Sequence, residues 1–334
     1  MALLLLLAIL PGSGCFLSCV KLSVDDPLPS LPFPEAEWIT HISGTAKVCS
    51  LSIPGAHDSA TSTLWTPVVD NFAKTQTLSI GELWDAGVRA FDLRPAVGGN
   101  GSLQIYHGPF SAHISFSECI GTILSCLGAH PGEFAVVLIR HEVEGDEGSP
   151  SWESLMREEL SSLPGNRVRE TFSPDLTVDD MRGRILFLSR NTYEGGPVGG
   201  YVTSWSSSSD LSAQKGCRID SHPFWVQDYY DPEGEEGKWA AVKGMMDAFS
   251  SLGEESTVWC MNYTAGYVGG FLGLPSYEGN AVNVNLRAAR YIRESVAGPL
   301  GIVMMDFAGA LHFRGTPVWG DYLVKSIICH NAFQ

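Results

Sequence analysis

Short apolar runs alternate with amphipathic stretches along most of the chain. Eight runs have the length and composition of buried strands, at 48–53, 88–93, 103–106, 134–139, 184–188, 223–227, 257–261 and 301–305. Helical spacing of apolar residues appears between most of them, at 79–84, 116–127, 152–160, 239–252 and 285–295, and again at 320–328, which closes the chain. Apolar strands that alternate with helices indicate a buried parallel sheet, and eight such strands predict a TIM-type (β/α)8 barrel.

The barrel is expected to be irregular. Residues 95–102, between the second and third runs, are too few to form a helix. Parallel neighbours need a crossover of a dozen or more residues, so a link this short favours an antiparallel return. We therefore predict a distorted α/β barrel with at least one antiparallel pair.

Composition narrows the class of partner. The 334 residues include 44% hydrophobic positions and carry a formal charge of -16, with no basic run. This argues against a nucleic-acid partner, because no basic run is present to neutralise phosphates. Simple attraction to anionic lipid is also disfavoured, so any contact with a membrane must be local and largely apolar.

The beginning of the chain suggests export. Residues 2–10 are all apolar and precede a Pro-Gly pair, and this run is too short to span a bilayer. A secretory signal over residues 1–20 is the favoured interpretation, with a misassigned start site as the alternative, since no positive residue lies near Met1. Six cysteines remain after residue 20, which permits disulfides, although buried free thiols fit equally well. We expect a secreted, extracellular protein.

Polar or charged side chains lie at or just beyond the end of every predicted strand. In chain order they are His57 and Asp58, Asp92 and Arg94, His107, Arg140, Arg190, Asp228, Asn262 and Asp306. Barrel active sites are built at the carboxyl ends of the strands, so these groups are expected to share one face.

Two of the nine histidines stand out. His57 and His107 each follow a predicted strand beside a glycine and a proline, whereas the others suit structural or solvated positions. Two imidazoles supply a general base and a general acid near neutral pH, and an arginine fork such as that of Arg94 suits a phosphate. This set of residues points to cleavage of a phosphodiester.

The motifs that carry these residues resemble those of a known family. The chain is similar, over residues 37–330, to the single-domain, bacterial-type phosphatidylinositol-specific phospholipases C of the X-domain family. The matching stretches are Ser-Ile-Pro-Gly-Ala-His-Asp-Ser at 52–59, Phe-Asp-Leu-Arg at 91–94, His-Gly-Pro at 107–109, Ile-Arg-His-Glu at 139–142, Val-Gln-Asp-Tyr-Tyr at 226–230 and Met-Asp-Phe at 305–307. The resemblance implies one catalytic barrel domain.

The resemblance also implies catalytic roles. His57, supported by Asp306, would take the proton of the inositol 2-hydroxyl, which then attacks phosphorus. His107, assisted by Asp58, would protonate the departing diacylglycerol oxygen, and Arg94 would stabilise the charged phosphate. The products would be diacylglycerol and inositol 1,2-cyclic phosphate, which makes the step a phosphorus-oxygen lyase reaction.

Substrate recognition is implied in the same way. Arg140, Arg190, Asp228 and Tyr230 would bind inositol hydroxyls, and Arg140 departs from the lysine common in the bacterial enzymes. Trp205 is expected either to touch the membrane at the barrel mouth or to stack on the inositol ring. The expected substrate is phosphatidylinositol or a glycosylphosphatidylinositol lipid, with peripheral membrane contact, no cofactor, no metal and a monomeric state.

Two other functions stay open at this point. One is a barrel phosphodiesterase for glycerophosphodiesters or sphingolipids, which typically holds a divalent metal among carboxylates. The other is a non-catalytic relative that binds lipid or inositol. Arg94 at the place of a carboxylate ligand argues against the first, and the intact set of acid, base and guanidinium argues against the second.

Overall fold

A barrel forms the centre of the molecule. The computed structural model of the chain describes residues 28–64, 73–146, 152–169, 171–191, 199–253, 255–269 and 275–334. Within these residues nine strands close a ring in the order β6-β2-β1-β15-β12-β11-β10-β9-β8 and back to β6. The ring strands are β1 (Ser52–Ala56), β2 (Ala90–Leu93), β6 (Ala135–Ile139), β8 (Ile185–Ser189), β9 (Gly200–Thr203), β10 (Arg218–Ile219), β11 (His222–Gln227), β12 (Trp259–Tyr263) and β15 (Gly301–Met305). The predicted irregular TIM-type barrel is confirmed.

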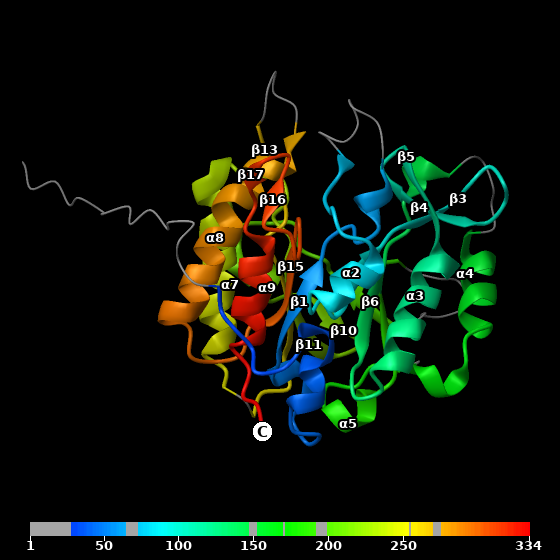
Figure 1. The fold of residues 1–334 in the computed structure, drawn as a ribbon. Coiled ribbons are helices and arrows are strands. Elements are labelled where there is room, and N and C mark those ends of the chain that lie inside the picture. Colours follow the sequence, from blue (N-terminus) through cyan, green and yellow to red (C-terminus); the bar gives the residue numbers. More distant parts are fainter. Residues whose placement is uncertain are drawn as a thin grey trace, which may run out of the picture.

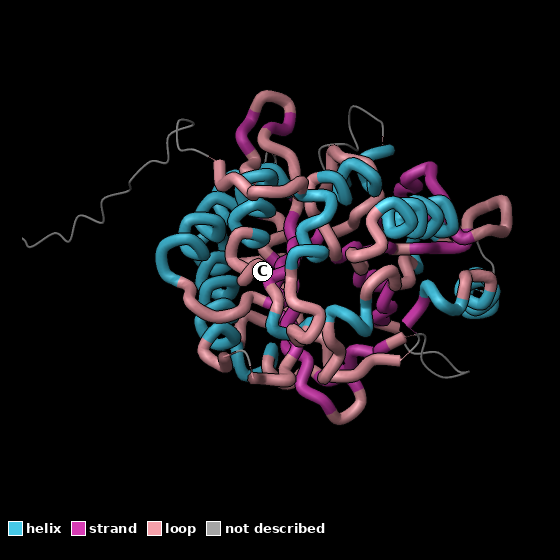
Figure 2. Tube along the Cα trace, turned by 60° about the horizontal axis from the view of Figure 1, so that its bottom comes forward, coloured by secondary structure: helices cyan, strands magenta, loops and turns pink. Residues whose placement is uncertain are grey.

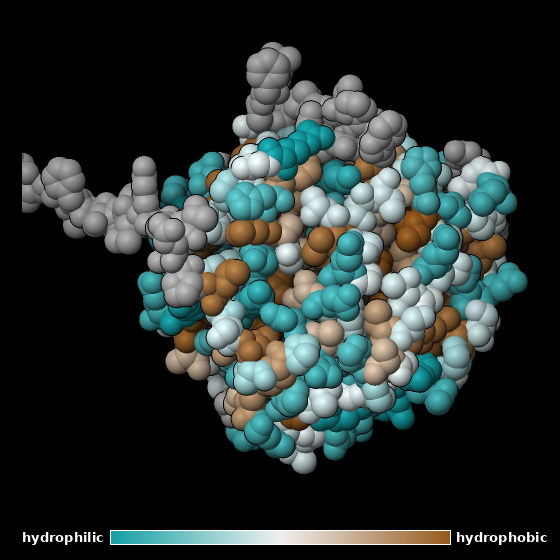
Figure 3. Space-filling view, viewed as in Figure 1, coloured by the Kyte–Doolittle hydropathy of each residue, from teal (hydrophilic) through white to brown (hydrophobic). Residues whose placement is uncertain are grey.

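Helices surround the strands, as Figure 2 shows from the end at which the chain finishes. The helices are α2 (Ile80–Asp85), α3 (Phe116–Ala129), α4 (Trp152–Ser161), α5 (Val178–Met181), α6 (Leu211–Gln214), α7 (Gly234–Ser250), α8 (Tyr277–Ser295) and α9 (Gly320–Ile328). In Figure 1, α7, α8 and α9 lie together on one side of the barrel, and α3 and α4 lie on the other. On the face seen in Figure 3, hydrophobic residues are scattered among hydrophilic ones.

The third predicted strand is not part of the ring. β4 (Leu103–His107) instead lies between β3 (Pro95–Val97) and β5 (Phe110–Ser115) in a separate antiparallel sheet. The chain has no crossover helix after β2, so it can only turn back on itself at this point. The antiparallel return that the short link predicts is therefore present, but outside the barrel.

The ring is completed by strands that the sequence pattern did not indicate. β9 and β10 are short, and the serine-rich stretch between them has the composition of a loop. β10 pairs antiparallel with both β9 and β11, whereas the other neighbours in the ring run parallel. These two short strands close the ring where an eighth β/α unit is missing.

Some element boundaries also differ from the prediction. The first strand begins at Ser52, because Val48–Ser50 forms a short 3-10 helix, and the Pro-Gly pair lies within β1 rather than ending it. Gly55 is needed there, since a Cβ atom would come within 2.3 Å of the sulfur of Met304 on the neighbouring strand. α7 and α8 begin several residues earlier than expected, because their polar, glycine-containing first turns lack an apolar stripe.

Short hairpins and isolated turns complete the description. β7 (Val168–Arg169) pairs with β8 outside the ring, β13 (Val268–Gly269) pairs with β14 (Pro275–Ser276), and β16 (His312–Phe313) pairs with β17 (Thr316–Pro317). All six cysteines in the described part of the chain are free thiols. No helix in the described ranges is long and apolar enough to cross a membrane. The predicted signal at residues 1–20 lies outside the described residues.

A fully buried ion pair fixes the end of the barrel opposite the mouth. Arg89, just before β2, donates from Nε to Glu133 at 2.8 Å, and both side chains are inaccessible to solvent. The guanidinium also donates to the backbone carbonyls of Glu35, Ala36, Trp84 and Val88. Glu133 accepts in turn from the backbone N–H groups of Ile39 and Thr40. This pair therefore joins the N-terminal segment to two neighbouring barrel strands.

Replacing Arg89→Met is expected to lower the free energy of unfolding by about 3–5 kcal/mol, because it leaves the buried Glu133 carboxylate without its cation. Chemical denaturation of the two proteins measures the difference. Lys243→Met is the matched control, since it removes a cation from the solvent-accessible Lys243–Asp247 pair, which is worth about 0.5 kcal/mol or less. Equal destabilisation by both variants contradicts the role assigned to Arg89.

Candidate active site

A polar cavity of about 370 Å³ opens at the carboxyl ends of the barrel strands. Most of the polar residues predicted to share this face contribute to its walls. The lining consists of His57, Arg94, His107, Gly108, Arg140, Glu142, Glu144, Arg190, Ser207, Asp228, Tyr230, Ala265, Gly266, Tyr267 and Tyr277. Asp58 and Asp306 lie directly behind His57 and are buried. The polar residues in this lining therefore share one face, whereas Asn262, which was predicted to join them, does not line the cavity.

The end of β1 is shaped to present His57 and Asp58. The backbone N–H of His57 donates to the carbonyl of Met305, which continues the pairing of β1 with β15. Asp58 then adopts a φ of 44°, a left-handed conformation that is uncommon for a residue with a Cβ atom. Ser59 locks this turn by donating to the carbonyl of Ala56 and accepting from the N–H of Asp92.

The ring of His57 has a defined tautomer. Its Nδ1 lies 2.8 Å from Oδ1 of Asp306, a buried carboxylate that can only accept while ionised. Nδ1 therefore carries the proton, which leaves Nε2 directed into the site. Burial by itself lowers the pKa of His57, but Asp58 and Asp306 outweigh this effect and raise it. These contacts suit an imidazole that accepts a proton at Nε2.

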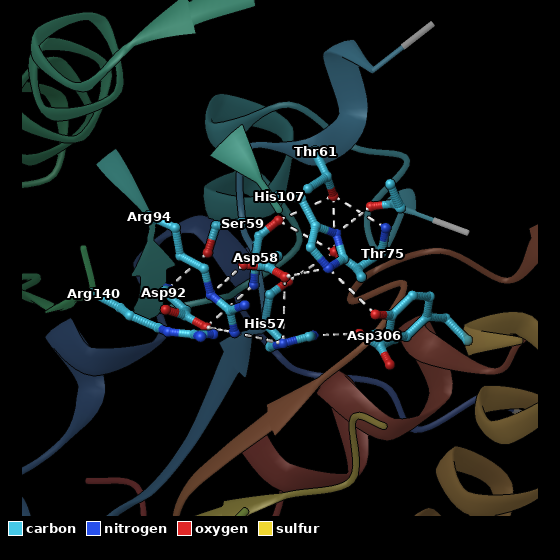
Figure 4. Close-up of polar contacts among 12 residues, drawn as sticks. His57, Asp58, Ser59, Thr61, Thr75, Asp92, Arg94, His107, Arg140 and Asp306 are labelled. Atoms are coloured by element: carbon cyan, nitrogen blue, oxygen red, sulfur yellow. Dashed lines mark hydrogen bonds and ion pairs between the residues drawn. The ribbon is translucent and has the colours of Figure 1, made fainter. Parts of the chain in front are cut away.

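Arg94 lies among the carboxylates at the end of β2 (Figure 4). Its Nε is 2.5 Å from Asp58 and its NH2 group is 3.0 Å from Asp92. The same NH2 group donates to Nε2 of His57 at 2.8 Å. Burial opposes ionisation of Asp58, but Arg94, His107 and His57 lower its pKa to about 2. The pKa of Arg94 itself is raised, because neighbouring carboxylates outweigh its burial.

His107 reaches the site because β4 runs back along the continuation of β2. The backbone N–H of Tyr106 donates to the carbonyl of Arg94, so the two catalytic candidates lie side by side. Nδ1 of His107 lies 2.6 Å from the carbonyl of Ala73, which accepts only, so Nδ1 carries a proton. Nε2 is 3.5 Å from Oδ2 of Asp58, the same oxygen that lies 3.4 Å from Nε2 of His57. The two imidazoles therefore share one carboxylate.

The far wall of the cavity contains paired charges. Arg190 lies 3.5 Å from Asp228, and Arg140 lies 3.8 Å from Glu142. Tyr230 is about half exposed at the rim. These groups offer donors and acceptors in alternation, which suits a ring with several hydroxyl groups.

Trp205 is not among the residues that line the cavity. Its indole Nε1 donates to Asp228 at 2.8 Å, and the guanidinium of Arg190 lies over its ring at 4.0 Å. The edge of the ring meets Tyr263 with centroids 6.0 Å apart. Trp205 is thus partly buried beside the cavity, with Arg190 over one face of its ring, and its predicted contact with a membrane or a substrate ring stays a prediction. It orients the two residues that do line the cavity.

Asn262 is also structural rather than part of the site. It lies within β12, is fully buried, accepts from Gln227 and donates to the carbonyl of Val242. Asp92 forms an ion pair with Arg94.

Sequence reasoning missed several residues that support the site. Gln76 donates to the carbonyls of His57 and Met305 and accepts from the N–H of Ala308, so it ties together the ends of β1 and β15. Lys238 is fully buried in α7 and donates to the carbonyl of Tyr229, beside Asp228. Burial lowers the pKa of Lys238 to about 8, although Asp228 and Asp306 oppose the shift. No sequence motif marks either residue, because each acts through backbone groups that only the fold brings near.

One group of side chains has the spacing of a metal site. Ligand atoms of His57, Asp58 and Asp92 lie within 4.8 Å of one another. The guanidinium of Arg94 contacts all three, so a fixed positive charge already occupies this position. A divalent cation added here meets like-charge repulsion, and the residues therefore do not fit a resident metal.

A barrel whose cavity combines paired imidazoles, a shared carboxylate and a buried guanidinium is the architecture of an acid–base phosphodiesterase. Comparison with known proteins narrows this class. Residues 51–191 match the family model described as phosphatidylinositol-specific phospholipase C, X domain. This part of the chain is therefore similar to the X domain, which confirms the resemblance seen in its motifs.

Similar proteins extend the match over most of the chain. The 1-phosphatidylinositol phosphodiesterase of Staphylococcus aureus (strain Newman) is 24% identical over 313 residues, which cover 90% of this chain and 96% of the relative. A structure of a variant of the phosphatidylinositol-specific phospholipase C from Staphylococcus aureus has a TM-score of 0.76 at 21% identity, covering 90% of this chain and 98% of that one. The enzyme from Listeria monocytogenes gives 0.64 at 22% identity, covering 90% and 100%. The structural matches establish a common fold.

Proposed function

We propose that the chain is a phosphatidylinositol-specific phospholipase C that cleaves the glycerol-side phosphodiester of its lipid substrate. The observation that carries this function is the arrangement of His57 and His107 about one oxygen of Asp58, with Arg94 on the other oxygen. The X domain and the full-length relatives support it. Incubation with phosphatidylinositol is expected to release diacylglycerol and a water-soluble inositol cyclic phosphate.

His57 is the proposed general base. Asp306 holds its Nδ1 proton, so Nε2 is free to take the proton of the inositol 2-hydroxyl. The contact from Arg94 to Nε2 is the resting arrangement, which a bound phosphate replaces by drawing the guanidinium toward its oxygens. Arg94 then stabilises the negative charge that develops on those oxygens during attack.

His107 is the proposed general acid. Asp58 stabilises its protonated form, in which Nε2–H faces the cavity. As the 2-hydroxyl oxygen bonds to phosphorus, the bond to the glycerol oxygen breaks and that oxygen takes the proton of His107. Because the nucleophile belongs to the substrate, the product is a 1,2-cyclic phosphate.

Recognition of the inositol ring is assigned to Arg140, Arg190, Asp228 and Tyr230. The two arginines are each matched by a carboxylate, so this wall offers hydrogen bonds without a surplus of positive charge. Trp205 contributes indirectly by fixing Arg190 and Asp228. This arrangement favours the hydroxyl groups of phosphatidylinositol or of a glycosylphosphatidylinositol lipid. The predicted secretion and the monomeric state remain expectations.

His57→Ala and His107→Ala are each expected to reduce turnover of phosphatidylinositol by roughly 10²–10⁴-fold, because each removes one proton-transfer group. Initial rates of product release measure the loss, with circular dichroism as a check on folding. A substrate with an aryl leaving group needs little protonation, so it should partly rescue His107→Ala and leave His57→Ala inactive. Rescue of His57→Ala instead reverses the two assignments.

Cleavage by the unmodified enzyme is expected to continue with little loss in excess chelator, because Arg94 occupies the place of a cation. Arg94→Ala should lower kcat by roughly 10²–10³-fold. Arg94→Lys keeps the charge but loses the fork, so it tests geometry without leaving the carboxylates unpaired. Loss of activity in chelator with recovery on adding calcium supports the metal-dependent class of phosphodiesterase instead.

Exposed apolar side chains on one part of the cavity rim suit a lipid surface. Phe110, at the start of β5, pairs directly with His107, and Val143 follows Glu142 on the same side. Both are exposed large hydrophobic residues, at 37% and 59%. Phe110 lies opposite the proposed acid in the β4–β5 pair, and Glu142, which precedes Val143, binds the N–H of Gly108 beside that acid. The acyl chains of the leaving group are expected to emerge there. With a net charge of -16, such apolar contact is the available means of holding the membrane.

The double variant Phe110→Ser/Val143→Ser is expected to lose roughly 30-fold or more activity on dilute phosphatidylinositol vesicles, since burial of each side chain in lipid is worth roughly 1–2 kcal/mol. Its activity on a soluble short-chain substrate should not change. Leu252→Ser, at an equally exposed position just after α7, is the matched control and should not affect either rate. A loss on both substrates places Phe110 and Val143 in catalysis rather than in membrane contact.

A further inference from the structure

Tyr277, which has no role in the proposed mechanism, contacts His107, the proposed general acid. Tyr277, the first residue of α8, lines the cavity, and its hydroxyl lies 3.3 Å from Nε2 of His107. The centroid of its ring is 5.6 Å from that of His107 and 6.4 Å from that of His57. The phenol therefore borders both imidazoles and touches the one atom of His107 that faces the cavity.

The ring of Tyr277 is held in place by its surroundings. It packs against an apolar cluster that includes Ala281, Phe307 and Val318, and the edge of Tyr267 meets it at 6.1 Å. Ser276 caps the helix at this point by accepting from the N–H of Gly279. With the ring fixed in this way, only the hydroxyl is presented to the polar cavity.

The protonation state of each partner follows from the contacts. Nδ1 of His107 donates to the carbonyl of Ala73, so Nε2 of the neutral imidazole is an acceptor. The hydroxyl of Tyr277 is the donor in that state. Burial, followed by the carboxylates of Asp58 and Asp306, raises the pKa of Tyr277, so the phenol keeps its proton near neutral pH.

We infer that Tyr277 is a positioning residue for His107 that stabilises the neutral imidazole left after proton transfer. This inference rests on the proposed function. As the phosphorus–oxygen bond breaks, its electron pair goes to the glycerol oxygen, which takes the proton of Nε2. The lone pair created on Nε2 then accepts the hydrogen bond of Tyr277, which remains protonated throughout.

Asp58 and Tyr277 thus act on Nε2 in opposite directions. The carboxylate of Asp58, 3.5 Å away, favours the protonated imidazole, and the phenol favours the neutral one. Arg94 contacts the other oxygen of Asp58 and so affects His107 through that carboxylate. Glu142 accepts from the N–H of Gly108, the residue after His107. Tyr277→Phe keeps these charges and the ring, so it isolates the effect of the hydroxyl.

Tyr277→Phe is expected to lower kcat on phosphatidylinositol by roughly 2- to 10-fold, the worth of one hydrogen bond. The rate on an inositol phosphate with a p-nitrophenyl leaving group should hardly change, because that group departs without a proton. The alkaline limb of the kcat profile on phosphatidylinositol should move up by roughly 0.4–1 pH unit, since the neutral form of His107 has lost its donor. Tyr291→Phe, which removes a hydroxyl from the same helix at Asp247, is the matched control and should behave as the unmodified enzyme.

The outcomes distinguish a failure of the proposed function from a failure of the role of Tyr277 alone. Unmodified enzyme that leaves phosphatidylinositol intact overturns the proposed function, and the role of Tyr277 with it. Active unmodified enzyme with equal losses on both substrates in Tyr277→Phe, or with no shift of the alkaline limb, overturns the role of Tyr277 alone. A loss confined to phosphatidylinositol together with the upward shift supports it.

Discussion

The ion pairs of Arg94 are the interaction on which the site depends. Asp58, Asp92 and Asp306 are all buried, and a buried carboxylate is costly unless a cation or a hydrogen-bond donor compensates its charge. The guanidinium of Arg94 compensates two of them directly and lowers the pKa of Asp58 to about 2. His57 compensates the third carboxylate, that of Asp306, by donating a hydrogen bond from Nδ1. The charges that catalysis requires are therefore also the charges that make the site stable.

β2 bears a buried arginine at each end. Arg89 precedes it and is neutralised by Glu133, and Arg94 follows it and is neutralised by Asp58 and Asp92. Since β2 lies between β1 and β6, these contacts bring its neighbours into register at both ends of the barrel. A strand of four residues is thus fixed by side-chain charges as well as by its backbone ladder.

The residues whose position could be predicted from the sequence are those that directly follow a barrel strand. His57, Arg94 and Asp306 follow apolar runs, so their position at the mouth followed from the general rule for parallel barrels. His107 was placed at the right site, but its strand was assigned to the barrel, because an apolar run does not reveal which sheet it joins. The contacts of Trp205 with Asp228 and Arg190 were not predicted, because these partners follow other strands. Tyr277 carried no signal, since only the path of α8 brings it to His107.

The departure from a regular barrel places the acid. In a regular barrel the strand after β2 would lie in the ring, separated from it by a crossover helix. Here β3 continues outward from Arg94 and β4 returns antiparallel beside it, with Pro95 opposite Ile105. The return puts His107 across Asp58 from His57. Consecutive parallel strands need a crossover of a dozen or more residues, and residues 98–102, which join β3 to β4, are too few for one. The short connection that the sequence shows between the two motifs is accordingly what allows two histidines to share one carboxylate.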